Sequence, residues 1–126
     1  MTDRVTATDA ALALVARLTA KHGSLLFHLS GGCCDGSAPL CLPRGEFRLG
    51  GRDLCLGTVG GAPFCMADDT FVWWKHSQVV LDVVTSRSGG FSLETPDGVR
   101  FIARARLFTD AELPGLAAPL PAHDIA

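Results

Sequence analysis

Paired glycines divide most of this chain into short segments. The four pairs are Gly31-Gly32, Gly50-Gly51, Gly60-Gly61 and Gly89-Gly90. Glycine adopts backbone angles that other residues rarely reach, so each pair predicts a turn or a break in regular structure. No pair belongs to a Walker loop or to a Gly-x-Gly-x-x-Gly unit between a strand and a helix. We therefore interpret the pairs as turns between short elements, not as phosphate-binding loops.

Residues 6–22 precede the first pair and predict one long amphipathic helix. Its apolar side chains recur at the spacing of a single helical face, at Ala11, Leu14, Val15 and Leu18. A threonine at position 6 or 8 can cap the helix, and Gly23 is a stop signal after its last turn. A second, short helix is predicted from Asp68 to about Ser77.

The rest of the chain has the pattern of short strands. They are predicted at 25–29, 46–49, 54–59, 78–84, 91–95 and 99–105. Short strands combined with two helices indicate an α+β fold. A length of 126 residues indicates a single domain, 1–126, with a core at about 5–109 and a tail at 110–126.

Composition excludes several classes of protein. Hydrophobic residues make up 48% and charged residues 19% of the chain, as in ordinary globular domains and unlike disordered ones. The net charge of -2 gives no basic patch for a nucleic acid. The first residues lack a basic region followed by an apolar one, and no apolar run reaches the roughly 18 residues of a membrane span. We expect a cytoplasmic protein with no membrane or nucleic-acid partner.

Five cysteines include a cluster in one loop. Cys33, Cys34 and Cys41 follow the Gly31-Gly32 pair, and His28 lies five residues before Cys33. An odd number of cysteines in a reducing compartment indicates metal binding, thiol chemistry or burial, and not a disulfide framework. Thiolate and imidazole ligands suit an iron, zinc or copper ion or an iron–sulfur cluster. The spacing C-C-x6-C does not identify the metal.

Three interpretations of this loop compete. A metal site would use some of Cys33, Cys34, Cys41, His28 and His76. A thiol-redox site would have one cysteine of low pKa, and Cys41 or its neighbour would resolve the oxidised form. A cysteine nucleophile at Cys33 or Cys34 with a histidine base at His28 or His76 is also compatible with the sequence. Simple burial is the third interpretation, because free cysteine behaves as a small hydrophobic residue. Burial is also the expectation for Cys55 and Cys65, which lie among apolar neighbours.

Three stretches resemble a family of small proteins known as a domain of unknown function. They are His28-Leu29-Ser30-Gly31-Gly32-Cys33-Cys34-Asp35-Gly36, Trp74-Lys75-His76 and Gly90-Phe91-Ser92-Leu93-Glu94. Members of that family are often encoded beside aldehyde or alcohol dehydrogenases. The resemblance implies such a dehydrogenase as a partner.

The layout is also similar, more distantly, to the A-type iron–sulfur carriers of the HesB-like fold. Gly32-Cys33 matches the carriers' loop cysteine, and Leu81-Asp82-Val83-Val84, Gly89-Gly90-Phe91 and Thr95-Pro96 match later segments. This resemblance implies a HesB-like fold of mostly antiparallel strands with the long helix at its N-terminus. The carriers also have a C-terminal Cys-x-Cys pair, whereas this chain has no cysteine after Cys65. The same cluster ligands are therefore not available within one chain.

The leading hypothesis is a non-catalytic metal- or iron–sulfur-binding accessory protein of an aldehyde or alcohol dehydrogenase system. A homodimer would supply ligands that one chain lacks. The alternative is a small thiol-redox or cysteine-dependent enzyme that acts on a reactive electrophile such as an aldehyde. A third hypothesis is an interaction module anchored by Trp73 or Trp74, because tryptophan is enriched at binding hot spots.

Overall fold

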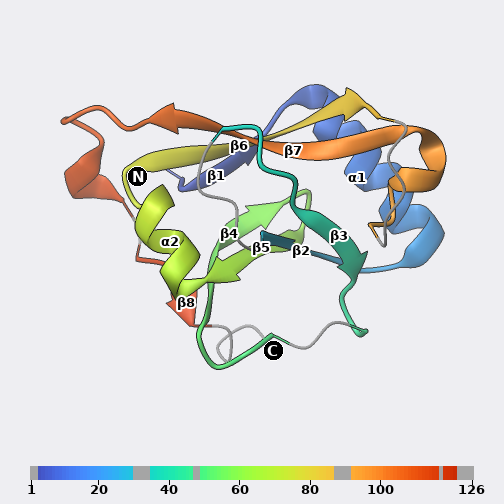
Figure 1. Ribbon diagram of the computed structural model, residues 1–126, viewed down its shortest axis with the longest axis horizontal. Helices are drawn as coiled ribbons and strands as arrows, with labels where there is room; N and C mark the ends of the chain where they lie inside the picture. The colour runs from blue at the N-terminus through green and yellow to red at the C-terminus, as the bar shows by residue number, and fades with distance from the viewer. Residues whose placement is uncertain (1–2, 30–34, 47–48, 87–91, 117, 122–126) are drawn as a thin grey trace.

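Residues 3–29, 35–46, 49–86, 92–116 and 118–121 are described by the structure, a computed structural model. Within them the strands form two sheets, one of three strands and one of five (Figure 1). The three-stranded sheet has the order β1 (Val5–Ala7), β6 (Ser77–Thr85), β7 (Val99–Leu107). The five-stranded sheet has the order β3 (Leu40–Pro43), β2 (Leu25–Leu29), β5 (Ala62–Ala67), β4 (Asp53–Val59), β8 (Leu120–Pro121).

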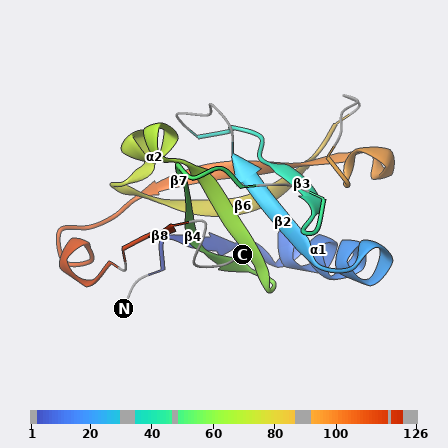
Figure 2. The same ribbon diagram turned by 90° about the horizontal axis from the view of Figure 1, so that it is seen from below.

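Helix α1 (Asp9–His22) begins at the cap that its sequence offers. The hydroxyl of Thr8 accepts a hydrogen bond from the Ala11 amide at 3.2 Å, and Gly23 ends the helix at a φ of 84°. The four residues of the expected apolar face are all buried, which confirms the helical periodicity. Figure 2 shows α1 and the second helix, α2 (Asp68–Trp74), at opposite ends of the molecule.

The expected fold class is wrong in its architecture. We expected an α+β, HesB-like fold with mostly antiparallel strands and one long N-terminal helix, but the chain is mostly β and its sheets are mixed. Strand β1 pairs with β6 in parallel, and β2 pairs with β5 in parallel. Helix α1 has only 14 residues, because residues 5–7 form β1 instead of a first helical turn. The β1–β6 pairing joins residues more than 70 positions apart, so no local pattern predicts it.

Two other segments also differ from expectation. Glu46 and Leu49 lie outside any strand, and residues 47–48 lie outside the described part of the chain. Residue 91 of the strand predicted at 91–95 lies outside the described residues, and residues 92–94 are a bend and a turn instead. They lead into a short 3-10 helix, η1 (Thr95–Asp97), where Pro96 disfavours strand pairing. A second such helix is η2 (Leu113–Gly115), in the tail. By contrast, β6 and β7 contain the strands predicted at 78–84 and 99–105.

The main core fills the space between the two sheets. Side chains from α1 pack there against Phe27, Phe64 and Met66 of the five-stranded sheet and Leu81 and Phe101 of the three-stranded sheet. We call this side of the five-stranded sheet its inner face. A smaller cluster of Leu26, Cys55 and Cys65, against which Leu49 packs, lies on the opposite side, which we call the outer face. In the described residues, no helix is both long and apolar enough to cross a bilayer.

Candidate functional site

Strand β2 divides its side chains between the two faces. Leu25, Phe27 and Leu29 belong to the main core, whereas Leu26 belongs to the outer cluster. Since successive side chains of a strand point to opposite sides, His28 lies on the outer face with Leu26, as its alternation in the sequence predicts. Only 7% of His28 is exposed, and its register partner on β5 is Cys65.

The His28 side chain reaches across a neighbouring strand. Its Nε2 atom is 3.0 Å from Oδ1 of Asp53, which is the first residue of β4. Strand β5 lies between β2 and β4, and two strand spacings amount to roughly 10 Å. A 3.0 Å contact over that distance requires the imidazole to extend above β5, on the face to which Cys65 belongs.

Asp53 is held in place by its own turn. The Gly50 amide donates to Oδ2 of Asp53 at 2.6 Å, and the Asp53 amide donates to the Gly50 carbonyl at 3.1 Å. The other carboxylate oxygen accepts from protonated Nε2 of His28. The pair is therefore a positioned imidazole–carboxylate couple, nearly excluded from solvent, with side chains that are 9% and 12% exposed.

Cys55 and Cys65 form a disulfide directly beside this couple. They are register partners on the antiparallel strands β4 and β5, with Cα atoms 4.1 Å apart. Both are buried, as expected from the sequence, but their bond was not expected. Cys65 is fully buried and lies between Cys55 on one neighbouring strand and His28 on the other. The outer face thus brings a disulfide, an imidazole and a carboxylate together.

A β-bulge creates this disulfide. The tight turn at Gly60-Gly61 pairs Val59 with Ala62 and Gly57 with Phe64, a register that would place Leu56 opposite Cys65. The register shifts by one residue between Cys55 and Gly57, so Cys55 takes that place. A bulge inserts one extra residue into one strand of an antiparallel pair.

Cys41 lies in the opposite environment. It pairs with Phe27, belongs to the main core and is fully buried on the inner face, so the sheet separates it from His28. Burial, together with the nearby charge of Glu94, raises the pKa of the Cys41 thiol to about 12. Among the described residues it is the free cysteine, and at neutral pH it is a protonated thiol.

Ser92 and Glu94 join the edges of the two sheets around Cys41. The Cys41 amide donates to Oγ of Ser92 at 2.8 Å, and Ser92 donates in turn to Oε1 of Glu94. The Phe101 amide of β7 donates to Oε2 of Glu94 at 3.0 Å. Glu94 is fully buried, and these bonds satisfy both of its oxygens. Ser92 and Glu94 therefore form a structural joint between β3 and β7.

The other expected ligands do not gather around His28 in the described structure. His76 is exposed in the turn after α2, where its carbonyl accepts from the Phe108 amide at 3.0 Å. Cys33 and Cys34 lie outside the described residues. The described part of their loop is anchored to β7, because Asp35 accepts from the Ala105 amide at 2.7 Å. No three His, Cys, Asp or Glu side chains within the described ranges are placed to hold a metal ion.

Sequence reasoning missed three members of the outer-face site. Cys55 and Cys65 are expected only as core residues, and Asp53 carries no expectation at all. Their one sequence signal is that the two cysteines flank the Gly60-Gly61 turn at nearly equal distances. A hairpin across that turn would have brought them near each other. The bulge that aligns them has a signal of its own, because Gly57 is an isolated glycine inside the strand predicted at 54–59 and the register shifts next to it.

Comparison with known proteins identifies the family. Residues 14–107 match the family model described as a domain of unknown function (DUF779). Neither the curated proteins nor the solved structures gave a match. The match includes His28, Asp53, Cys55, Cys65 and the Cys41–Glu94 joint. Because it extends over well more than half of the 126 residues, the chain belongs to the DUF779 family.

Proposed function

We propose that the chain is a thiol–disulfide redox protein whose reactive group is the Cys55–Cys65 pair. The observation that carries the proposal is the His28–Asp53 couple, which spans β5 beside Cys65. A disulfide that only braces a hairpin needs no buried imidazole and carboxylate next to one of its sulfurs. Histidine and aspartate are seldom buried in an apolar cluster, so their burial beside the disulfide is an informative departure from ordinary packing.

The His28–Asp53 couple makes the two sulfurs of the disulfide differ in how readily each leaves as a thiolate. Disulfide exchange is faster when the departing sulfur leaves as a stabilised thiolate, and a neighbouring imidazolium lowers the pKa of a thiol. Cys65 is the register neighbour of His28, so Cys65 is the leaving sulfur and Cys55 the sulfur that is attacked. Asp53 is a positioning residue that orients the imidazole through the 3.0 Å contact between its Oδ1 and Nε2 of His28.

The exchange balances without any added cofactor. A thiol RSH loses its proton to solvent, and its thiolate forms a bond to Sγ of Cys55 while the Cys55–Cys65 bond breaks. The electron pair goes to Sγ of Cys65, which then takes up a proton. A second thiolate attacks the R sulfur of the mixed disulfide and releases RSSR and Cys55, which is protonated. The protein disulfide is reduced to a dithiol, and two RSH are oxidised to RSSR.

The metal- or cluster-binding accessory role stays a prediction, as do a dehydrogenase partner and a homodimer. That role depends on Cys33 and Cys34, which lie outside the described residues. Of its other expected ligands, Cys41 and His28 lie on opposite faces of one sheet, and His76 is exposed in the turn after α2. The thiol-redox alternative was expected at the loop cysteines; a redox function at Cys55 and Cys65 needs only groups that the outer face brings together, and we favour it for that reason.

The test is a redox titration of the purified protein. The protein is equilibrated in dithiol–disulfide buffers of graded potential, its free thiols are alkylated, and the alkyl groups are counted by mass. We expect Cys55 and Cys65 to become reduced together in the wild type and in Cys41→Ala. If they stay joined in buffers poised at about -300 mV, the range of structural disulfides, the pair is a brace and the proposal fails.

A matched pair of histidine variants tests the role of the couple. His28→Gln should slow the reduction by about tenfold, the effect of losing one charged neighbour worth about 1.4 kcal/mol. His76→Gln changes an exposed histidine outside the site and should leave the rate unchanged. Equal rates for both variants would remove His28 from the mechanism. Elemental analysis of the wild type and Cys33→Ser tests the metal prediction on the same material.

A further inference from the structure

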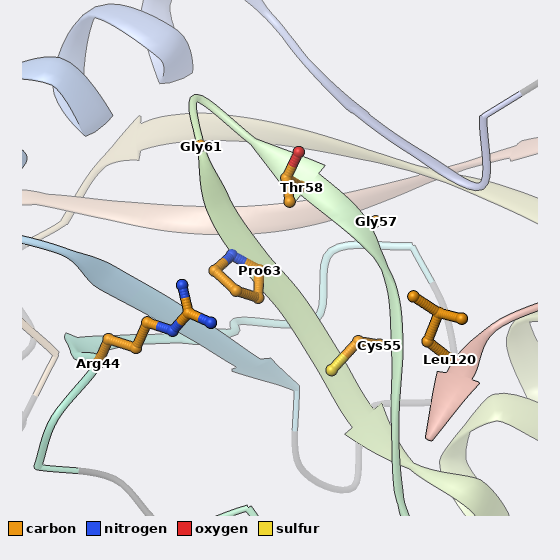
Figure 3. A pocket seen from close by; sticks show the side chains of 7 residues that line it. All are labelled: Arg44, Cys55, Gly57, Thr58, Gly61, Pro63 and Leu120. Carbon is orange, nitrogen blue, oxygen red and sulfur yellow. The ribbon is translucent and has the colours of Figure 1, made fainter. Parts of the chain in front are cut away.

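A cavity opens on the outer face beside the disulfide. Its volume is about 320 Å³, at the small end of the range for ligand pockets. Figure 3 shows the described side chains around it, which are Arg44, Cys55, Gly57, Thr58, Gly61, Pro63 and Leu120. The cavity thus extends over strands β4 and β5 next to the sulfur that the proposed exchange attacks.

Only one of the two sulfurs is reached from this cavity. Cys55 lines it, whereas Cys65, which is 0% exposed, is not among its described lining residues. Cys55 itself is 4% exposed, so a thiol on the surface of a folded protein would not approach it. An attacking thiol must be small enough to enter the cavity. The substrate is therefore a low-molecular-weight thiol and not a folded protein.

The charge of the residues that line the cavity further restricts the class of thiol that it can bind. Arg44 is the charged side chain among the described lining residues; the others are apolar or small, apart from the Thr58 hydroxyl. In Figure 3 the Arg44 guanidinium extends over the sheet towards Pro63, on the side to which the Cys55 sulfur points. A guanidinium binds carboxylates through two parallel hydrogen bonds, and the described lining contains no acidic side chain to repel one.

We infer that the cavity is a substrate pocket for small thiols that carry a carboxylate, and for their disulfides. The carboxylate binds Arg44 and the sulfur reaches Cys55. This inference rests on the proposed redox function of the Cys55–Cys65 pair. Pro63 lies between Arg44 and Cys55 in Figure 3, so it contacts the carbon chain between the two ends of the substrate. Such thiols are of amino-acid or short-peptide size, which matches the cavity volume.

The experiment measures how fast small thiols of different charge reduce the oxidised protein. The probes are 3-mercaptopropionate, 2-mercaptoethanol and cysteamine. Each rate is divided by the rate at which the same thiol reduces a small, uncharged disulfide in the same buffer, which removes differences in thiolate fraction and in thiolate nucleophilicity. We expect the anionic thiol to react about tenfold faster than the neutral one, the effect of one charged hydrogen bond, and the cationic thiol to react slowest. A thiol on a folded carrier protein should be at least about tenfold slower than the neutral probe, by the same reasoning on access.

Variants of two arginines distinguish binding of the carboxylate in the cavity from a general effect of positive charge on the protein surface. Arg44→Gln should bring the anionic thiol down to the rate of the neutral one and leave the neutral rate unchanged, and Arg44→Lys should restore part of the difference. Arg52→Gln removes an exposed arginine that pairs with Asp68 and does not line the cavity, so it should change neither rate.

Each failure has its own signature. If no thiol reduces the pair, the proposed function fails and this inference fails with it. If all three thiols reduce it at one normalised rate, or if Arg44→Gln slows them equally, the redox function stands and the carboxylate pocket is wrong. If the carrier-protein thiol reacts as fast as the small ones, the restriction to small substrates is wrong.

Discussion

The inner and outer faces of the five-stranded sheet both bury cysteine, but in opposite chemical settings. On the inner face Cys41 lies among aromatic and aliphatic side chains, and burial together with Glu94 raises the pKa of its thiol to about 12. On the outer face Cys65 is just as buried, yet it lies between a second cysteine and an imidazole. Burial alone therefore does not decide what a cysteine can do. Its neighbours on the adjacent strands decide it.

The same contrast extends to the carboxylates of the two faces. Glu94 receives its hydrogen bonds from a hydroxyl and a backbone amide, so it joins two sheet edges. Asp53 accepts from a backbone amide and from His28, so it orients a group that can carry a proton. We interpret the inner face as the main source of stability and the outer face as the site of chemistry.

The largest expected effect is on the inner face. Phe27 is fully buried, with its ring centroid 4.9 Å from that of Phe101 and 6.1 Å from that of Phe64. Phe27→Ala should lower the free energy of unfolding by about 3–5 kcal/mol, measured by urea denaturation of the oxidised protein. Leu26→Ala, one residue away in the small outer cluster, is the matched control and should lower it by only about 2 kcal/mol. An equal or larger loss at Leu26 would show that the outer cluster stabilises the fold as much as the inner face does.

The next effect concerns the buried carboxylate of the inner face. Glu94→Ala leaves the Phe101 amide and the Ser92 hydroxyl without their acceptor and should lower the free energy of unfolding by about 2–3 kcal/mol. Glu94→Gln keeps an acceptor for the Phe101 amide and should lower it by about 1 kcal/mol. Thermal and urea unfolding of both variants measure the difference. Two equal losses would show that the hydrogen bonds of Glu94 do not hold the two sheet edges together.

The smallest effect is a pH dependence that originates at Cys41. Its pKa is 9.0 ordinarily and about 12 in the folded chain, so the folded state favours the protonated thiol. That contribution is fully present below pH 9 and is lost as the pH rises towards 12. At pH 10 the wild type should lose about 1.4 kcal/mol of stability relative to its value at pH 8, through this group alone.

Cys41→Ala is the control for this pH dependence. The variant lacks the thiol, so its unfolding free energy should fall by about 1.4 kcal/mol less than that of the wild type between pH 8 and pH 10. Urea denaturation at the two pH values measures both slopes. Identical slopes would mean that Cys41 titrates as an ordinary thiol, and the contrast between the two faces would lose its electrostatic part.

Local patterns predicted much of the framework. The apolar spacing of α1, its Thr8 cap and its Gly23 stop are properties of neighbouring residues, and the structure confirms them. Alternation along β2 predicted that His28 and Phe27 point to different faces, and this is also confirmed. The HesB-like architecture was wrong, because it depended on which strands pair and in which direction. The parallel pairings of β1 with β6 and of β2 with β5 are contacts between distant segments.

In the candidate site, too, local patterns predicted single residues but not the contacts between distant segments. The sequence directed attention to His28 and to the Cys33–Cys34 loop, and His28 belongs to the outer-face site. Cys55 and Cys65 were expected only to be buried, and nothing predicted that Asp53 would reach His28 across β5. The contact between His28 and Asp53 can be predicted only when the order of the strands in the sheet is known. The two residues are 25 positions apart and lie on strands that do not pair.

The sequence alone predicted that α1 starts at residue 6, whereas it begins at Asp9. It did determine where α1 ends, which side of β2 carries His28, and that both cysteines flanking the Gly60-Gly61 turn are buried. These follow from the periodicity of side chains along one segment, which is a local property. Only the tertiary structure decided that Cys55, and not Leu56, lies opposite Cys65. A one-residue bulge makes that choice, and register is set by packing between strands, which no single strand encodes.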